Sequence, residues 1–102
     1  MRFLTALLVV LASAVSVSAG PVEHGRALAD EFCGPCHAVG RKDRSPHAAA
    51  PALRELGKYY DLDALPHRLM RGISASHPEM PVVKFRPRDA RDLRAYLRTI
   101  QD

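Results

Sequence analysis

Two cysteines and a histidine stand close together in the first half of the chain, in the order Cys33-Gly34-Pro35-Cys36-His37. The pattern C-x-x-C-H is typical of covalent c-type haem attachment. Two thiols three positions apart can add to the two vinyl groups of one porphyrin, and the next residue then presents an imidazole to the iron. We therefore predict one covalently attached haem c, with its iron, bound through Cys33, Cys36 and His37.

Two other uses of the cysteine pair are open alternatives at this point. Cys-Gly-Pro-Cys is also an active-site tetrapeptide of thioredoxin-like thiol oxidoreductases, but that fold needs a βαβ pattern, and no stretch here shows strand alternation. A structural zinc site needs four ligands, and the chain has no second cysteine pair. The remaining histidines lack the paired spacing of zinc ligands, and we expect His24, His47 and His67 to be exposed to solvent.

The iron of an electron carrier needs a second axial ligand, and Met80 is the candidate. It lies in His77-Pro78-Glu79-Met80-Pro81, where nearby prolines restrict the backbone and lower the entropy lost on holding a thioether in place. Thioether ligation raises the reduction potential of haem iron. The competing ligands are Met70 and His77. An open distal site, as in a sensor or a peroxidase-like protein, is the other possibility.

Short helices joined by loops are the elements that must position these residues. Apolar spacing predicts a helix over residues 22–32 that leads into Cys33, and one or two helical turns over 51–60 with Gly57 as the stop. A helix over 61–70 has Asp61 as its cap and Gly72 as its end, with Pro66 either delaying its start or bending it.

The clearest predicted helix begins at Pro87 and continues to residue 100, with apolar residues recurring every three or four positions and arginines on another face. Residues 39–50 and 74–86 are predicted to be loops. The expected fold is therefore all-α, with three to four short helices and loops wrapped around one covalent haem.

Length and composition limit the protein to one small domain. Of the 102 residues, 1–19 have the layout of a secretory signal peptide: a positive start, an apolar run and small residues before Gly20. We expect its cleavage, a mature domain over 20–102 and a periplasmic location, with an uncleaved membrane anchor as the alternative. So small a domain excludes most enzyme folds, and a modest net charge of +4 without tryptophan argues against nucleic-acid binding.

Over nearly all of residues 22–102, the chain resembles the small class I c-type cytochromes of bacteria. Besides Cys33 to His37, Met80-Pro81 is similar to the distal methionine motif of the family. Gly25 is similar to its N-terminal helix glycine, and residues 93–97 resemble its C-terminal helix signature, in which an aromatic residue and a leucine pack across that glycine.

The resemblance also implies a partner for the proximal histidine. Residues 50–53 resemble the family segment whose proline carbonyl accepts a hydrogen bond from that histidine, so Pro51 would hold the outer nitrogen of His37. Two positions depart from the family pattern. Ala29 replaces the usual aromatic residue of the first helix, and Arg86 precedes Pro87 where Ser or Thr is common.

The function that follows is one-electron transfer, not enzymatic catalysis. We expect a monomeric periplasmic carrier that cycles haem iron between Fe(III) and Fe(II), without a membrane span after cleavage, with His37 and Met80 as axial ligands and with redox proteins as donor and acceptor. The alternative is a haem subunit of a larger periplasmic oxidoreductase complex.

Two groups of basic residues flank the segments that the resemblance places around the haem edge. They either steer an acidic redox partner or form ordinary solvated surface. Tyr59 or Tyr60 either donates to a haem propionate or packs in the core. The two basic groups are Arg41, Lys42 and Arg44, and Lys84, Arg86 and Arg88.

Overall fold

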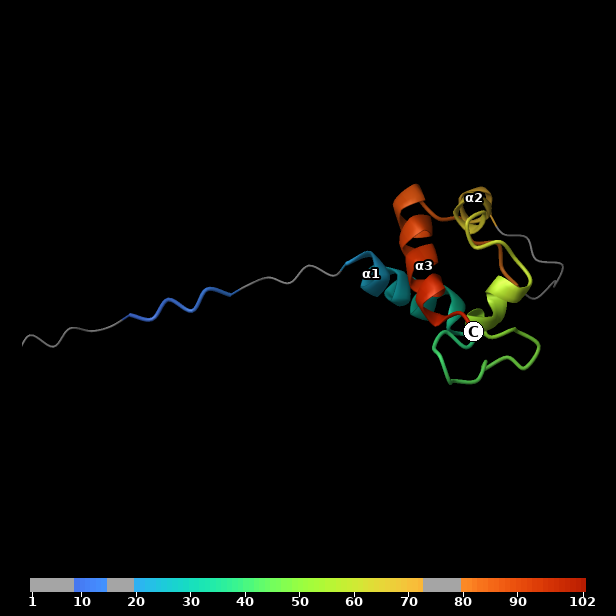
Figure 1. The fold of residues 1–102 in the computed structure, drawn as a ribbon, viewed down its shortest axis with the longest axis horizontal. Coiled ribbons are helices and arrows are strands. Elements are labelled where there is room, and N and C mark those ends of the chain that lie inside the picture. Colours follow the sequence, from blue (N-terminus) through green and yellow to red (C-terminus); the bar gives the residue numbers. More distant parts are fainter. Residues whose placement is uncertain (1–8, 15–19, 73–79) are drawn as a thin grey trace, which may run out of the picture.

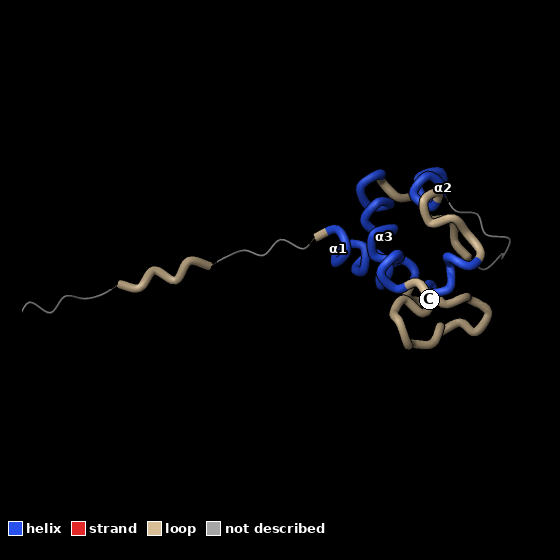
Figure 2. The backbone as a smooth tube through the Cα atoms, viewed as in Figure 1, coloured by secondary structure: helices blue, strands red, loops and turns tan. Residues whose placement is uncertain are grey.

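Short helices joined by loops make up the fold, seen in a computed structural model that describes residues 9–14, 20–72 and 80–102 (Figure 1). The elements in chain order are α1 (Pro21–Leu28), the π-helical turn η1 (Ala29–Cys33), the 3₁₀ helix η2 (Leu53–Lys58), α2 (Leu65–Arg71) and α3 (Pro87–Ile100). No strand occurs in these described ranges, which confirms the predicted all-α class (Figure 2). Residues 9–14 have no regular secondary structure, and no helix of the described chain is long and apolar enough to cross a membrane.

The crossing of α1 and α3 is the main helix contact. Gly25 is buried there, and a Cβ atom on it would lie 2.8 Å from the Cβ of Tyr96 and against the backbone carbonyl of Asp92. Only glycine allows so close an approach. The predicted packing of an aromatic residue across Gly25 is therefore confirmed.

His24 reinforces the same crossing, which corrects the expectation that it is exposed. Its Nδ1 lies 2.7 Å from Oδ2 of the buried Asp92, and its Nε2 lies 3.8 Å from Oδ1 of Asp89. His24 is half-buried because α1 packs it against the acidic side of α3. His47 is also half-buried, in the loop that follows the cysteine motif, where its Nδ1 accepts a hydrogen bond from Ala49 N.

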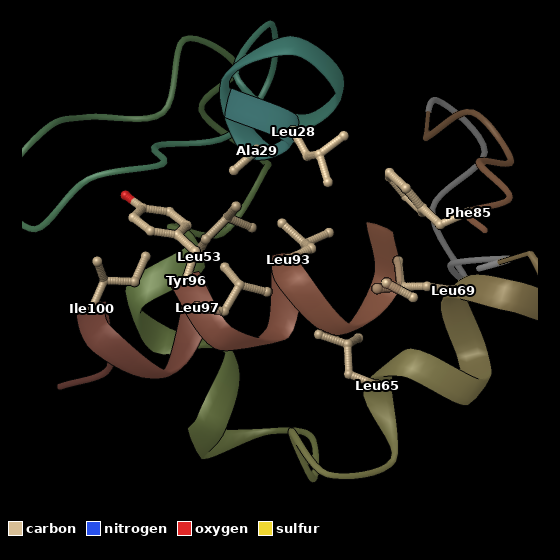
Figure 3. Close-up of a cluster of buried hydrophobic side chains, with 11 residues drawn as sticks. Leu28, Ala29, Leu53, Leu65, Leu69, Phe85, Leu93, Tyr96, Leu97 and Ile100 are labelled. Carbon is tan, nitrogen blue, oxygen red and sulfur yellow. The ribbon is translucent and has the colours of Figure 1, made fainter. Parts of the chain in front are cut away.

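Helix α3 supplies the centre of the hydrophobic core. Leu93 and Leu97 are each only 2% exposed, and Figure 3 shows them between the residues of α1 and η1 on one side and those of α2 on the other. The core is completed by Leu28, Ala29, Leu53, Leu65, Leu69, Phe85, Ala90, Tyr96 and Ile100. The predicted apolar face of the last helix is therefore confirmed, and it holds the other helices together.

The two middle helices differ in detail from their predicted limits. Helix α2 begins at Leu65 and not at residue 61, because Pro66 fits only the first turn of a helix. Asp61 instead caps the preceding turn, where its Oδ1 accepts a hydrogen bond from Asp63 N at 2.9 Å. Gly72 ends α2 as predicted, at a positive φ of 91° that favours glycine. Gly57 lies inside η2 and does not stop it.

Candidate functional site

The cysteine motif begins at the end of a continuous helical run. Helix α1 passes into the π-helical turn η1, which ends at Cys33, and π-turns of this kind often occur at functional sites. Two backbone hydrogen bonds to the Cys33 carbonyl then form a tight turn, one from Cys36 N at 3.1 Å and one from His37 N at 2.8 Å. The turn brings both sulfur-bearing residues and the histidine together.

The ring of His37 is held by the segment that the sequence singled out. Its Nδ1 lies 2.6 Å from the carbonyl oxygen of Pro51. Because a carbonyl only accepts, Nδ1 carries the proton, and the lone pair of Nε2 is left to bind a metal. This arrangement fits haem iron, since a hydrogen bond on the outer nitrogen fixes both the tautomer and the orientation of a ligating imidazole.

The loop that carries Pro51 is bound to the motif and to α3. Leu53 N donates to the Ala38 carbonyl at 2.9 Å, and Ala38 N donates to Ser45 Oγ, also at 2.9 Å. The hydroxyl of Tyr96 donates to the carbonyl of Val39, which ties the loop to the last helix. The position of the Pro51 carbonyl is therefore set by contacts far apart in the sequence.

Asp43 organises the turn that follows the motif. Its carboxylate accepts hydrogen bonds from Gly40 N at 2.9 Å and Val39 N at 3.1 Å, and Arg54 lies 3.8 Å away. Desolvation opposes ionisation, but these hydrogen bonds and the charge of Arg54 together lower the pKa of Asp43. Arg41, the first residue of the basic group after the motif, donates a hydrogen bond to the carbonyl of Thr99, near the end of α3.

The two cysteines are not joined to each other. Both are free thiols and half-buried, and burial raises the pKa of Cys33 to about 11. A thiol-exchange enzyme needs a cysteine with a lowered pKa, because the thiolate is its nucleophile. Cys33 therefore lacks the lowered pKa that disulfide exchange requires. The described residues also contain no group of three or more His, Cys, Asp or Glu side chains that could hold a metal ion.

Phe85, which follows Met80 in the chain, lies beside the residue that precedes the motif. Phe32, directly before Cys33, meets Phe85 edge to face with ring centroids 5.3 Å apart. Phe85 N donates to the Leu69 carbonyl at 2.9 Å, which attaches this segment to α2. Met80 itself is half-buried, whereas His77 lies outside the described residues.

The remaining candidate residues are all exposed: Met70, Tyr59, Tyr60 and His67. Met70 is 36% exposed and lines an open groove between α2 and α3. Tyr59 and Tyr60 are 69% and 49% exposed, so neither packs in the core, and the ring of Tyr60 lies 5.1 Å from the guanidinium carbon of Arg68. His67 is exposed, as predicted.

Comparison with known proteins agrees with the geometry of the motif. The family model for cytochrome c matches residues 22–101, so this chain belongs to the cytochrome c family. Membership implies haem-based electron transfer and a covalently attached haem c with its iron, which confirms the predicted cofactor.

A curated relative supports the same family. The chain is similar to cytochrome c-552 of Bradyrhizobium diazoefficiens, with 26% identity over 101 residues that cover 99% of this chain and 95% of that protein. No solved structure matches this chain.

Proposed function

We propose that this protein is a periplasmic single-haem electron carrier and not an enzyme, with His37 and Met80 as the axial ligands of the iron. The proposal depends most on one observation. The hydrogen bond between His37 and the Pro51 carbonyl fixes the imidazole with Nε2 free, within a turn that also presents two unpaired cysteines. When bound, the haem supplies reversible one-electron chemistry at iron.

The chain's own residues bind and orient that group. Cys33 and Cys36 would form the two thioether bonds, and His37 would ligate the iron through Nε2. The loop that carries Pro51 keeps the imidazole from rotating, because its backbone is bound to Ala38 and, through Val39, to Tyr96. Rigid ligands suit an electron carrier, since little rearrangement accompanies a change of oxidation state.

Met80 is the stronger of the two methionine candidates for the distal position. Its segment is attached to α2 through Phe85 and meets Phe32 beside the cysteine motif. Met70 instead lines a groove with residues of α3. Thioether ligation would favour the ferrous state.

We further propose that residues 1–19 are a cleaved signal peptide and that residues 20–102 act as a monomer between a redox donor and acceptor. The exposed basic residues Lys42, Arg44, Lys84 and Arg86 would attract an acidic partner. In that case the rate of electron exchange with an acidic partner falls steeply as salt is added. A flat salt profile would contradict the steering.

A visible spectrum and a mass measurement on protein exported by a haem-ligating host test the central proposal. We expect a mass gain of one haem after loss of residues 1–19, and the far-red charge-transfer band of Met–Fe(III) ligation. Met80→Ala should abolish that band, whereas the matched variant Met70→Ala should keep it. Colourless protein with two titratable thiols would refute haem attachment, and a band lost only in Met70→Ala would refute the ligand assignment.

Size-exclusion chromatography of native material separates a free carrier from a subunit of a larger complex. A single small species supports the proposed monomer. Co-elution with a larger oxidoreductase would instead support the subunit alternative, which uses the same haem chemistry with a permanent partner.

A further inference from the structure

An open groove of about 410 Å³ runs between α2 and α3, which lie side by side in Figure 1. Its apolar lining consists of Pro66 and Met70 from α2 and Pro87 from α3. Its cationic lining includes Arg91 and Arg94 from α3. None of the lining residues belongs to the cysteine motif or to the Pro51 loop, whereas Pro87 adjoins Arg86 and Arg88 of the second basic group.

Among the residues that the structure describes, the arginines of this groove have no acidic partner. Arg91 and Arg94 form no ion pair or hydrogen bond in the part of the chain that the structure describes. Asp63, the acid among the described lining residues, is already paired with Arg98. No acidic side chain of residues 9–14, 20–72 or 80–102 therefore neutralises the charge of Arg91 and Arg94.

The neighbouring charges strengthen this imbalance. Helix α2 has the sequence LPHRLMR, which contains Arg68 and Arg71 and no acidic residue. The acids of α3 are Asp89 and Asp92, and both face His24 at the crossing with α1. The acidic side chains of α3 are thus occupied on one side of the helix, while arginines line the other.

The arginine row also opposes helix formation. Arg91, Arg94 and Arg98 follow one another at spacings of three and four, and like charges at these spacings destabilise a helix. Asp63 offsets the charge of Arg98, whereas no acid in the described part of the chain does so for Arg91 or Arg94. An external anion bound between them would remove this repulsion.

We propose that the groove between α2 and α3 is a docking site for an acidic peptide segment of a partner protein. Arg91 and Arg94 bind its carboxylates, because the planar guanidinium matches a carboxylate through two parallel hydrogen bonds. The exposed Met70 and Pro87 pack against its backbone and apolar side chains, with the buried Pro66 beneath them. A peptide chain fits into a concave groove, whereas a flat membrane surface does not.

The inference goes beyond electron transfer and does not depend on it. The lining of the groove includes none of Cys33, Cys36 and His37. The carrier can therefore stay attached to one protein while its haem-binding side meets another.

Nuclear magnetic resonance on the exported, haem-loaded protein in its reduced state tests the proposal directly. A deca-glutamate peptide is titrated into arginine-labelled protein, and the side-chain Nε–Hε signals are followed. We expect the largest shifts at Arg91 and Arg94. Shifts confined to Arg41 and Arg44 would overturn the proposal. Because this readout uses the wild-type chain, it does not depend on the folding of a variant.

Matched charge variants give the second test. Arg91→Gln/Arg94→Gln and the matched control Arg26→Gln/Lys58→Gln each remove two positive charges. The first pair lies in the groove, and the second pair is exposed on α1 and η2, outside the groove and both basic groups. The groove pair should weaken binding of the labelled peptide by about tenfold or more, as expected for the loss of two charge-assisted hydrogen bonds. The control pair should change it by less than about threefold, since only screened long-range charge is lost.

Two results of these measurements would overturn the docking site. Equal losses in both variants would mean that the peptide responds only to net charge. If the groove variant instead loses binding to phosphatidylglycerol vesicles but keeps its affinity for the peptide, the surface binds membrane and not protein. Neither result bears on haem attachment, which the visible spectrum tests independently.

Discussion

Replacement of Gly25 by alanine should separate the two helices that hold the fold together. A Cβ at this position would lie 2.6 Å from the carbonyl carbon of Asp92 and 2.8 Å from the Cβ of Tyr96, and closer still to the Asp92 oxygen. Ordinary contact begins at 3.4 Å. The obstacle is largely helix backbone, which cannot rotate away as a side chain can, so α1 must move outward by about 1 Å.

The size of the effect follows from two opposing contributions. Overpacking of a close contact costs about 1–3 kcal/mol, and a gap of about 1 Å forfeits up to half of the dispersion energy between the separated surfaces. We therefore take about 3 kcal/mol as the cost at the crossing. The substitution also stabilises the helix by about 1 kcal/mol, because alanine favours the helical conformation more than glycine does. The net expectation is a loss of about 2 kcal/mol in the free energy of unfolding.

Equilibrium unfolding in guanidinium chloride, followed by circular dichroism at fixed pH, measures this loss. Ala27→Gly is the matched control, because Ala27 is an exposed residue of the same helix. That variant should lose about 1 kcal/mol through helix propensity alone. If Gly25→Ala is as stable as the wild type, or about 1 kcal/mol more stable, then propensity alone governs the site and the close crossing is not a constraint.

Three further substitutions test the core and the titrating groups. Burial raises the pKa of Tyr96, so its protonated form stabilises the fold below pH 10, and this stabilisation is lost as pH rises through the native pKa. Tyr96→Phe also loses the hydrogen bond to the Val39 carbonyl and should cost about 1 kcal/mol of stability at pH 7. The difference in stability from the wild type should become smaller in unfolding curves at alkaline pH. The pKa of Asp43 is lowered, so its contribution to the free energy of unfolding is present above pH 3.8 and is lost as pH falls through the native pKa. Asp43→Asn should therefore be less stable than the wild type at pH 6 and equally stable in strong acid. Leu97→Ala removes a side chain that is 2% exposed and should cost about 2–5 kcal/mol in chemical denaturation.

Each of these has a result that would contradict it. For Tyr96→Phe it is a deficit that stays constant through alkaline pH, since the hydroxyl would then not titrate differently in the folded and unfolded states. For Asp43→Asn it is a deficit that persists below the native pKa. A loss below 1 kcal/mol in Leu97→Ala would mean that the core refills the space left by the side chain.

The cysteine motif and the last helix were predictable because each depends on residues close together in the sequence. The order Cys33, Cys36, His37 predicts the cofactor by itself, since the tight turn that gathers these residues needs only local hydrogen bonds. The apolar spacing that ends at Ile100 likewise predicts α3, which is long enough for its period to be clear. Its buried face then follows from the same pattern.

Limits of the middle helices were less predictable, because local signals compete there. Asp61 is a good helix cap by type, but it caps a turn, and Pro66 moves the start of α2 to Leu65. Gly57 was predicted to end a helical turn, yet the 3₁₀ helix continues to Lys58. Short segments contain too few apolar positions for the pattern to decide between such signals.

The sequence by itself determined the chemistry of this protein: which sulfur and nitrogen atoms are available, and the helices that carry them. Only the tertiary structure decided which distant groups act together. It pairs His24 with Asp92, and it leaves Arg91 and Arg94 beside α2 without a partner among the described residues. The physical reason is that these relations depend on how the helices cross, and the close approach at Gly25 joins residues that lie far apart in the sequence.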